Sequence, residues 1–227
     1  MSHIYKRRID IDSGDSLALI ARKITRGSRV LELGAATGYF SRFLKEELGC
    51  TVDGVELDAA MAERASAYCE KLLVADLGKE RLLDHFDAAA YDFIVCADVL
   101  EHLYSPAALL EQLPALLRPG GKVAVSIPNV GYAGLILDLI AGDFQYRDEG
   151  LLDRTHIRFF TRGSFTGILE TLGYEVEAVE PVVRAFEDSE FFGRLDLYPV
   201  PLKNYLFARP DADAYQFVFV ACPAGTR

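Results

Sequence analysis

Three acidic residues stand at or near the ends of predicted strands, and two glycines follow the first of them. Glu32 lies two residues before Gly34, Gly38 closes the turn, and Glu56 and Asp76 end the next two apolar runs. A carboxylate accepts hydrogen bonds from ammonium and hydroxyl groups, and glycine lets the backbone approach a ligand closely. The pattern predicts a cofactor site. Taken singly, each residue could instead be a structural glycine or a solvated loop carboxylate.

The spacing of the glycines excludes two phosphate-binding turns. A dinucleotide-binding turn requires G-x-G-x-x-G, and the corresponding positions are Gly34, Ala36 and Tyr39. Tyrosine at the last position would prevent close packing of the helix on the strand. A P-loop is excluded because no Gly-Lys-Ser/Thr follows the turn. A nicotinamide-dependent oxidoreductase is therefore disfavoured.

Two histidines are the candidate catalytic residues. His102 follows the fourth predicted strand, His156 lies in the segment LLDRTHIRFFT, and we expect both on the ligand side of the sheet. An imidazole suits proton transfer near neutral pH, so either could take the proton of a reacting hydroxyl. His85 is not expected on that side. The alternative role for His102 is packing at the start of a helix.

Strand-like and helix-like segments alternate along the chain, which predicts a parallel sheet covered by helices on both faces. The predicted strands are 29–33, 51–57, 71–75, 93–97, 122–127, 174–179 and 215–222. The predicted helices are 16–24, 40–48, 59–69, 133–140, one that begins at Pro106 and is split at Pro114, and one from Thr161 to near Gly173. Asp58, Ser105 and Thr161 are predicted N-caps.

Two segments interrupt this alternation, at residues 129–158 and 184–212. We expect one domain over residues 1–227, with these segments as a small inserted cap. Insertions beside the carboxyl ends of strands are where such folds build substrate pockets. The alternative is a cap that only covers apolar surface.

Composition narrows the class of protein. The chain has 227 residues, of which 51% are hydrophobic and 26% charged, and a net charge of −10. The charge argues against a nucleic-acid partner, and no apolar run reaches the roughly 18 residues of a membrane span. The first residues lack the apolar region of a signal peptide. Four scattered cysteines (Cys50, Cys69, Cys96 and Cys222) indicate buried free thiols. We expect a cytoplasmic protein.

The order of these residues resembles the class I S-adenosylmethionine-dependent methyltransferases. The turn from Glu32 to Gly38 is similar to their first motif, with Ala36 in place of the middle glycine. The segments TVDGVELD, LLVADLG, YDFIVCADVLEHL and LRPGGKVAVSIPN resemble the strand motifs that follow. The resemblance implies a Rossmann-like, doubly wound α/β fold whose seven strands have the order 3-2-1-4-5-7-6, the last strand being antiparallel.

The resemblance also implies that S-adenosylmethionine is the cofactor. Glu56 would bind both ribose hydroxyls, Asp76 would accept from the adenine amino group, and Leu57 and Leu77 would flank the ring. Glu32 would accept from the ammonium group, directly or through water. The predicted cofactor-binding residues are Glu32, Gly34, Ala35, Gly38, Glu56, Leu57, Asp76, Leu77 and Ala97.

A finer resemblance concerns Asp98, Glu101, His102 and His156. Ubiquinone-pathway O-methyltransferases and small-RNA 2′-O-methyltransferases carry Glu-x-x-Glu-His at this place, and the RNA enzymes add a later histidine and bind a divalent metal there. Asp98 is one carbon shorter than that first glutamate. We therefore predict His102 and His156 as catalytic residues without a metal. The alternative is that Asp98, Glu101, His102 and His156 together bind a divalent metal.

The predicted function is methyl transfer to a small-molecule, sugar or lipid-like acceptor at a hydroxyl oxygen. This follows from the segment DEGLLDRTHIRFFTRGSF, which is similar to methyltransferases of bacterial polysaccharide and lipid biosynthesis. The alternative is a non-catalytic S-adenosylmethionine-binding regulatory protein. The sequence makes no prediction of the oligomeric state.

Overall fold

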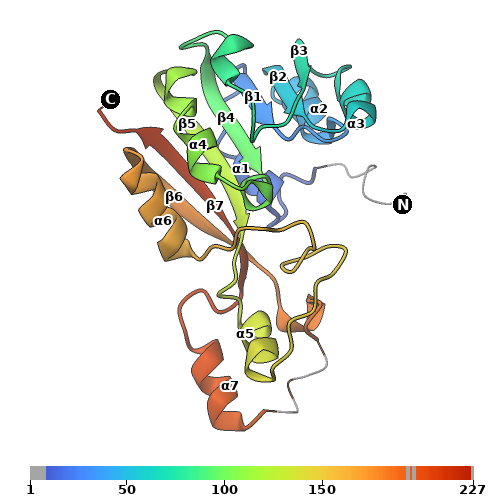
Figure 1. The fold of residues 1–227 in the computed structure, drawn as a ribbon, viewed down its shortest axis with the longest axis vertical. Helices are drawn as coiled ribbons and strands as arrows, with labels where there is room; N and C mark the ends of the chain where they lie inside the picture. Colours follow the sequence, from blue (N-terminus) through green and yellow to red (C-terminus); the bar gives the residue numbers. More distant parts are fainter. Residues whose placement is uncertain (1–8, 193–194, 196–197, 226–227) are drawn as a thin grey trace.

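The computed structural model describes residues 9–192, 195 and 198–225, and its centre is a seven-stranded sheet (Figure 1). The strand order is β3-β2-β1-β4-β5-β7-β6, as predicted. Strand β7 runs antiparallel to both of its neighbours, and the other pairs are parallel. The strands are β1 (Arg29–Leu33), β2 (Thr51–Glu56), β3 (Lys71–Val74), β4 (Tyr91–Ala97), β5 (Leu117–Pro128), β6 (Tyr174–Val183) and β7 (Ala214–Pro223).

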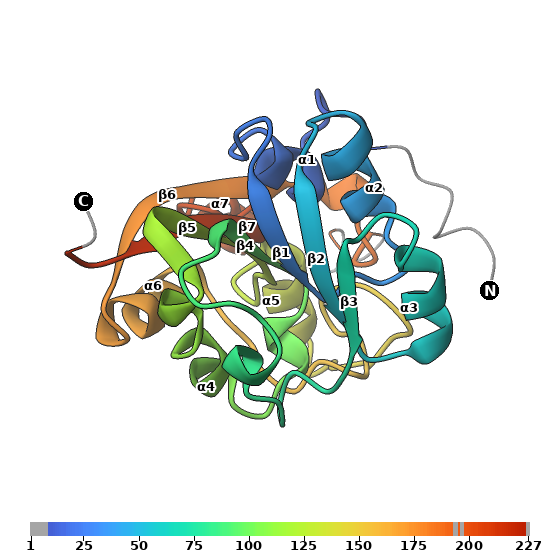
Figure 2. The same cartoon turned by 90° about the horizontal axis from the view of Figure 1, so that it is seen from above.

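Helices cover both faces of the sheet, with α1 and α2 on one side and α4 and α6 on the other (Figure 2). Alternate residues of a strand pack against opposite layers: Val30 contacts the α1–α2 layer, while Leu31 contacts the α4–α6 layer. The helices are α1 (Ser16–Ala21), α2 (Tyr39–Glu46), α3 (Ala59–Ala65), α4 (Pro106–Leu110), α5 (Ala133–Ile140), α6 (Arg162–Thr171) and α7 (Val200–Phe207). Among the described residues, none of these helices has the length and apolar character needed to cross a bilayer.

Capping residues start the helices where the sequence predicts. The Asp58 carboxylate accepts from the N–H groups of Ala60 and Met61, and Thr161 forms a reciprocal capping box with Ser164. Ser105 precedes α4, although its side chain makes no capping hydrogen bond. Pro114 lies in a short 3-10 helix after α4, so the predicted split is confirmed.

Several elements differ from the prediction, and the larger differences are these. Helix α3 ends at Ala65 rather than near residue 69. Strand β5 begins at Leu117, because the Pro119-Gly120-Gly121 turn is absorbed into the strand as an irregularity next to β4. Helix α7 lies in a segment where no helix was predicted. Its apolar residues are spread around the helix without a single stripe, and the segment begins between two prolines.

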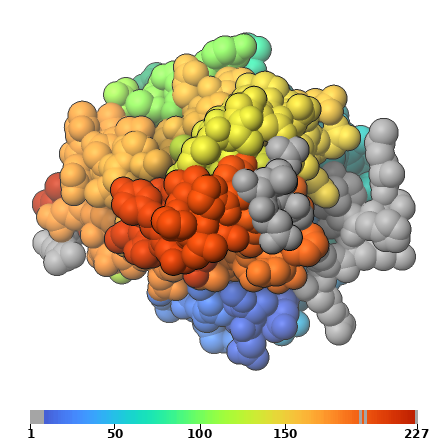
Figure 3. Space-filling view, turned by 90° about the horizontal axis from the view of Figure 1, so that it is seen from below, coloured from blue at the N-terminus to red at the C-terminus, as the bar shows by residue number. Residues whose placement is uncertain are grey.

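Residues 129–158 and the described part of 184–212, here called the cap, lie at the carboxyl ends of the central strands. Figure 3 shows α5 and the loop after it beside α7 on one surface. Their apolar side chains share one buried cluster, formed by Tyr132, Leu135, Leu137, Leu151, Leu152, Phe186, Phe191, Leu206 and Tyr215. Tyr215 belongs to β7, so the cap packs directly onto the sheet.

Candidate functional site

A cavity of about 490 Å³ lies at the carboxyl ends of β1, β2, β3 and β4. It brings together five of the predicted cofactor residues, namely Gly34, Glu56, Leu57, Asp76 and Leu77. Parallel strands end at the same edge of the sheet, which is why residues from three separate strand ends meet here. Ala35, Gly38, Glu32 and Ala97 are not among the residues that line the cavity.

Glu56 is held in place by backbone donors. Its Oε2 accepts from Ala36 N–H at 2.8 Å, and its Oε1 accepts from Asp58 N–H at 2.9 Å. A carboxylate offers about four lone-pair directions, so each oxygen keeps one for a ligand in the cavity. The carboxylate is therefore oriented before a ligand binds, and it can still accept from two hydroxyl groups.

The backbone conformation and close packing of the turn require glycine at two positions. Gly34 has φ +84°, and a Cβ there would lie 2.5 Å from Val99 Cγ2. Gly38 has φ +76°, and a Cβ there would lie 2.6 Å from the Cα of Ala65 in α3. Ala36 has φ +47°, in the left-handed region where the resemblance expects glycine. Gly38 is thus fixed by helix packing, and only Gly34 also borders the cavity.

Glu32 points away from the cavity towards α2. Its side chain is buried, and its carboxylate accepts from Ser41 Oγ. Burial raises the pKa of Glu32 to about 8, and the nearby Glu56 acts in the same direction. Contact of Glu32 with a cofactor ammonium group stays a prediction.

Asp76 is oriented at the far end of the cavity. Its carboxylate accepts from Gly78 N–H at 2.9 Å and from Lys79 Nζ at 2.8 Å. These hydrogen bonds, that of Lys79 first, lower the pKa of Asp76. Leu57 is 68% exposed and lines the same cavity with Leu77. Such an exposed leucine at a cavity wall suits contact with a flat apolar ring.

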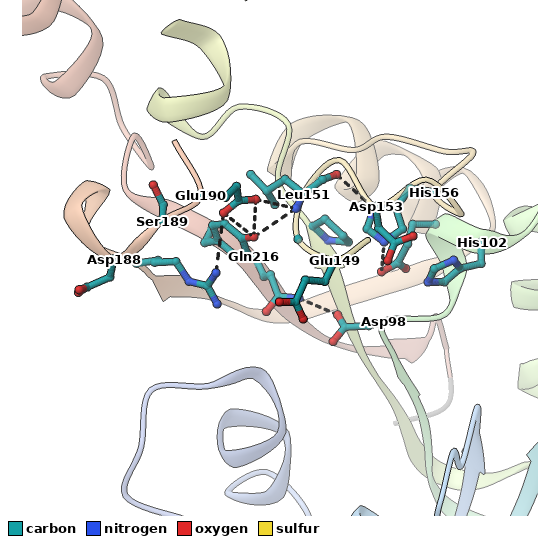
Figure 4. Close-up of a pocket in the computed structure, with 15 residues that line it drawn as sticks. Asp98, His102, Glu149, Leu151, Asp153, His156, Asp188, Ser189, Glu190 and Gln216 are labelled. Carbon is teal, nitrogen blue, oxygen red and sulfur yellow. Dashed lines mark hydrogen bonds and ion pairs between the residues drawn. The ribbon is translucent and has the colours of Figure 1, made fainter. Parts of the chain in front are cut away.

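A second cavity, of about 660 Å³, opens between the sheet and the cap (Figure 4). It shares Asp98 and His102 with the first cavity. Its other walls come from the loop 149–156, from residues 184–190 and from the start of β7. The two cavities thus adjoin at the end of β4, where the candidate catalytic residues lie.

The loop that carries His156 is docked on the 3-10 helix that carries His102. The carbonyl oxygen of Glu101 accepts from the N–H groups of Ile157 at 2.9 Å and Arg158 at 3.0 Å. This docking brings the two imidazoles together, with ring centroids 4.8 Å apart. Both rings line the second cavity. Their catalytic roles stay predictions.

The residues that orient His102 were not among those predicted from the sequence. Its Nδ1 lies 3.1 Å from Thr155 Oγ1 and 3.3 Å from the Thr155 carbonyl oxygen. Thr155 Oγ1 donates to Asp153 Oδ1 at 2.6 Å, so it can only accept from His102. The hydrogen-bond partners therefore assign the proton to Nδ1 and the lone pair to Nε2. Asp153 and Thr155 lie within three residues of His156 in the sequence, but nothing in the local sequence shows that they reach His102.

His156 is fixed in the same way. Its Nδ1 lies 3.1 Å from the carbonyl oxygen of Leu151, which makes Nδ1 the donor. Its Nε2 lies 3.9 Å from Glu101 Oε1, too far for a hydrogen bond. Burial lowers the pKa of His156, so its neutral form is favoured.

Glu101 is a buried carboxyl group without a partner. It is 1% exposed, and neither of its oxygens has a hydrogen bond. Burial, followed by repulsion from Asp98, raises its pKa well above the usual range. Buried polar groups are nearly always satisfied, so this carboxyl group is suited to bind a ligand donor or a cation.

The donor set fits a divalent cation. Glu101, His102 and His156 each offer one ligand atom, and these three atoms lie within 4.8 Å of one another. Both imidazoles donate Nδ1–H to a carbonyl oxygen, as metal-bound histidines do. Asp98 is held elsewhere, because its Oδ1 accepts from Ser126 Oγ at 2.7 Å and Gln216 Nε2 at 2.8 Å. The metal-free site remains a prediction, and a three-residue cation site is its alternative.

Comparison with known proteins identifies the family. A model of the methyltransferase domain matches residues 1–179. The chain belongs to this methyltransferase domain family. Its strand order is that of the class I, S-adenosylmethionine-dependent methyltransferases, and S-adenosylmethionine is the cofactor.

Curated relatives and solved structures agree with this family. The ubiquinone biosynthesis O-methyltransferase of Coxiella burnetii is 26% identical over 133 residues, which are 57% of this chain and 56% of that protein. The protein of the same name from Ralstonia nicotianae is 25% identical over 192 residues, 82% of this chain and 78% of that one. The chain thus spans about half the length of the first relative.

Among solved structures, an S-adenosylmethionine-dependent methyltransferase from Mesorhizobium loti superposes with a TM-score of 0.61. The superposition covers 93% of this chain and 99% of the other at 20% identity. At this identity the likeness shows the fold.

Proposed function

We propose that the protein transfers the methyl group of S-adenosylmethionine to a hydroxyl oxygen of a small-molecule acceptor. The observation that carries this proposal is that the cofactor cavity and the cap cavity meet at Asp98 and His102. A methyl group that leaves the first cavity would enter the second beside an imidazole. The likeness to ubiquinone biosynthesis O-methyltransferases supports an oxygen as the methylated atom.

The cofactor is already activated, so the protein mainly aligns the reactants and excludes water. In an in-line displacement, the acceptor oxygen forms a bond to the methyl carbon while the carbon–sulfur bond breaks. S-adenosylhomocysteine leaves, and the hydroxyl proton passes to a base. The free Nε2 of His102 is suited to take that proton, because Nδ1–H is already donated to Thr155. Asp153 accepts from the Thr155 hydroxyl and so fixes the group that orients His102.

A cation-bound form of the site would divide these roles differently. Glu101, His102 and His156 would hold the cation, and the orphaned carboxyl group of Glu101 is the observation that favours this form. When bound, a divalent cation supplies Lewis-acid chemistry that lowers the pKa of a coordinated hydroxyl. His102 would then be a ligand rather than a base.

The test is a screen of hydroxyl-bearing compounds, read as release of S-adenosylhomocysteine with and without EDTA. We expect turnover with at least one compound. Turnover that survives EDTA supports the metal-free form, and turnover that EDTA abolishes and added cation restores supports the cation-bound form. Tight cofactor binding without turnover on any hydroxyl compound, but with turnover on amines or thiols, would contradict the proposal.

A further inference from the structure

The cap cavity is lined by far more negative than positive charge. Six acidic residues line it, namely Asp98, Glu101, Glu149, Asp153, Asp188 and Glu190. Burial raises the pKa of Asp98 and of Glu101, so the other four acids carry most of the negative charge. Arg184 is the one arginine or lysine among its lining residues. Arg184 is already engaged, because Nη1 lies 3.9 Å from Glu190 Oε2 and the guanidinium lies 3.8 Å from the Tyr215 ring centroid. Little positive charge on the protein is left to balance the other carboxyl groups.

The acids are distributed over the whole cavity. Glu149 and Asp98 face its centre, Asp153 lies at the end near the histidines, and Asp188 and Glu190 lie at the opposite end (Figure 4). They come from three separate parts of the chain: the end of β4, the first cap segment and the second cap segment. Folding therefore brings like charges together here at a cost in free energy, which a positively charged ligand would offset.

Glu101 gives independent evidence for a ligand. Its carboxyl group lines the cavity, is 1% exposed and has no hydrogen-bond donor. An ammonium group carries three donors and a positive charge, and it satisfies such a carboxyl group. A divalent cation held by Glu101 and the two histidines would satisfy Glu101 too, but it would leave Glu149, which lies outside that ligand set, without a counter-charge.

We propose that the acceptor is a cation: a small molecule that carries a protonated amine, seated between Glu101 and Glu149, with its reactive hydroxyl at His102. This inference rests on the proposed O-methyl transfer and specifies in addition that the acceptor is positively charged. Neutral phenols and sugars offer hydroxyl donors but no charge, and acidic acceptors are repelled. The amine anchors the molecule and is not the atom methylated, because its protonated nitrogen has no lone pair.

The test uses matched probes that differ only in charge. Dopamine, 4-ethylcatechol and 3-(3,4-dihydroxyphenyl)propionate share two hydroxyl groups, and glucosamine, glucose and glucuronate form a second series. Binding to the protein saturated with S-adenosylhomocysteine is measured by calorimetry at low and high salt, and methyl transfer is measured in parallel. We expect the ammonium member of a series to bind about tenfold or more tightly than the neutral member, with the difference shrinking at high salt.

Two substitutions make the test specific. Glu149→Gln should reduce the preference for the ammonium probe and leave the affinity for the neutral probe unchanged. Asp148→Asn is the matched control, because Asp148 is paired with Arg154 at 2.6 Å and does not line the cavity. It should change neither affinity.

The outcomes separate this inference from the proposed function. Methylation of neutral or acidic probes with no preference for the ammonium member would overturn the cationic acceptor and leave the O-methyltransferase standing. If no hydroxyl compound of any charge binds or is methylated, the proposed function fails and this inference fails with it.

Discussion

The imidazole rings of His102 and His156 lie edge to face, with centroids 4.8 Å apart and planes at 68°. Each ring donates Nδ1–H to a carbonyl oxygen, of Thr155 or of Leu151, so each Nε2 keeps a lone pair. Two such nitrogens beside the carboxyl group of Glu101 form a site for a proton or a cation. The pair therefore defines where transfer is expected.

The first prediction concerns Thr155. Thr155→Val keeps the size of the side chain but removes the hydroxyl that accepts from His102. We expect kcat to fall by about 2- to 10-fold, the equivalent of one net hydrogen bond, with KM for the cofactor unchanged. Thr155→Ser is the control and should restore the rate. Equal loss in both variants, or a rise in cofactor KM alone, would show that Thr155 only supports the loop.

The second prediction concerns Ala36, which has φ +47°. An L-residue in this region is strained by about 1–2 kcal/mol, while glycine costs about 0.5–1 kcal/mol in chain entropy. Ala36→Gly should therefore raise the free energy of unfolding by up to about 1 kcal/mol. The matched control is Ala35→Gly, because Ala35 is buried and its φ is not positive. It should destabilise the protein. Denaturant unfolding of both variants measures the two changes. If both substitutions destabilise the protein, Ala36 is not strained at its positive φ.

The third prediction concerns the buried Glu32, whose folded-state pKa of about 8 lies above the value of 4.5 that it has when unfolded. A carboxyl group with a raised pKa favours the folded state while it is protonated. Its contribution to the free energy of unfolding is therefore fully present below pH 4.5 and is lost as the pH rises through 8. Glu32→Gln mimics the protonated form. Its stability relative to wild type should therefore increase with pH, on the order of 2–4 kcal/mol between pH 5 and 8.5. A difference that stays constant across this range would contradict the burial argument.

The fourth prediction concerns recognition of the ribose by Glu56. Wild-type protein should bind adenosine more tightly than 2′,3′-dideoxyadenosine, and Glu56→Ala should remove this preference. Each charge-assisted hydrogen bond contributes about 1.5–3 kcal/mol before water compensates, so the wild-type preference should be about tenfold or more. Calorimetric titration of both nucleosides measures it. A preference that persists in Glu56→Ala would assign the ribose to another residue.

Much of the cofactor cavity could be predicted from the sequence, because the residues that form it belong to local sequence patterns. Apolar runs such as Arg29–Leu33 mark buried strands, and Glu56 and Asp76 at strand ends meet because parallel strands share an edge. The glycines show the limit of this reasoning. Gly38 is required by its contact with Ala65 of α3, a tertiary approach that spacing along the chain does not reveal.

The cavity between the sheet and the cap depends on contacts between segments that are far apart in the sequence. Glu149 and Asp153 lie in a segment without periodicity, and they reach the cavity because Ile157 and Arg158 donate to the Glu101 carbonyl oxygen. Nothing in the local sequence encodes that contact. The sequence therefore indicated both histidines but neither the acids around them nor the orientation of His102 by Thr155.

The most direct test of the account follows the methyl group itself. S-adenosylmethionine labelled with ¹³C at the methyl group is given to wild-type and His102→Ala protein with the best acceptor of the screen, and the product is examined by NMR. We predict an oxygen-bound ¹³C-methyl group from wild type, and a kcat lower by about 10²- to 10⁴-fold in the variant with unchanged affinity for S-adenosylhomocysteine. A label bound to nitrogen or carbon, or an undiminished rate in His102→Ala, would contradict it.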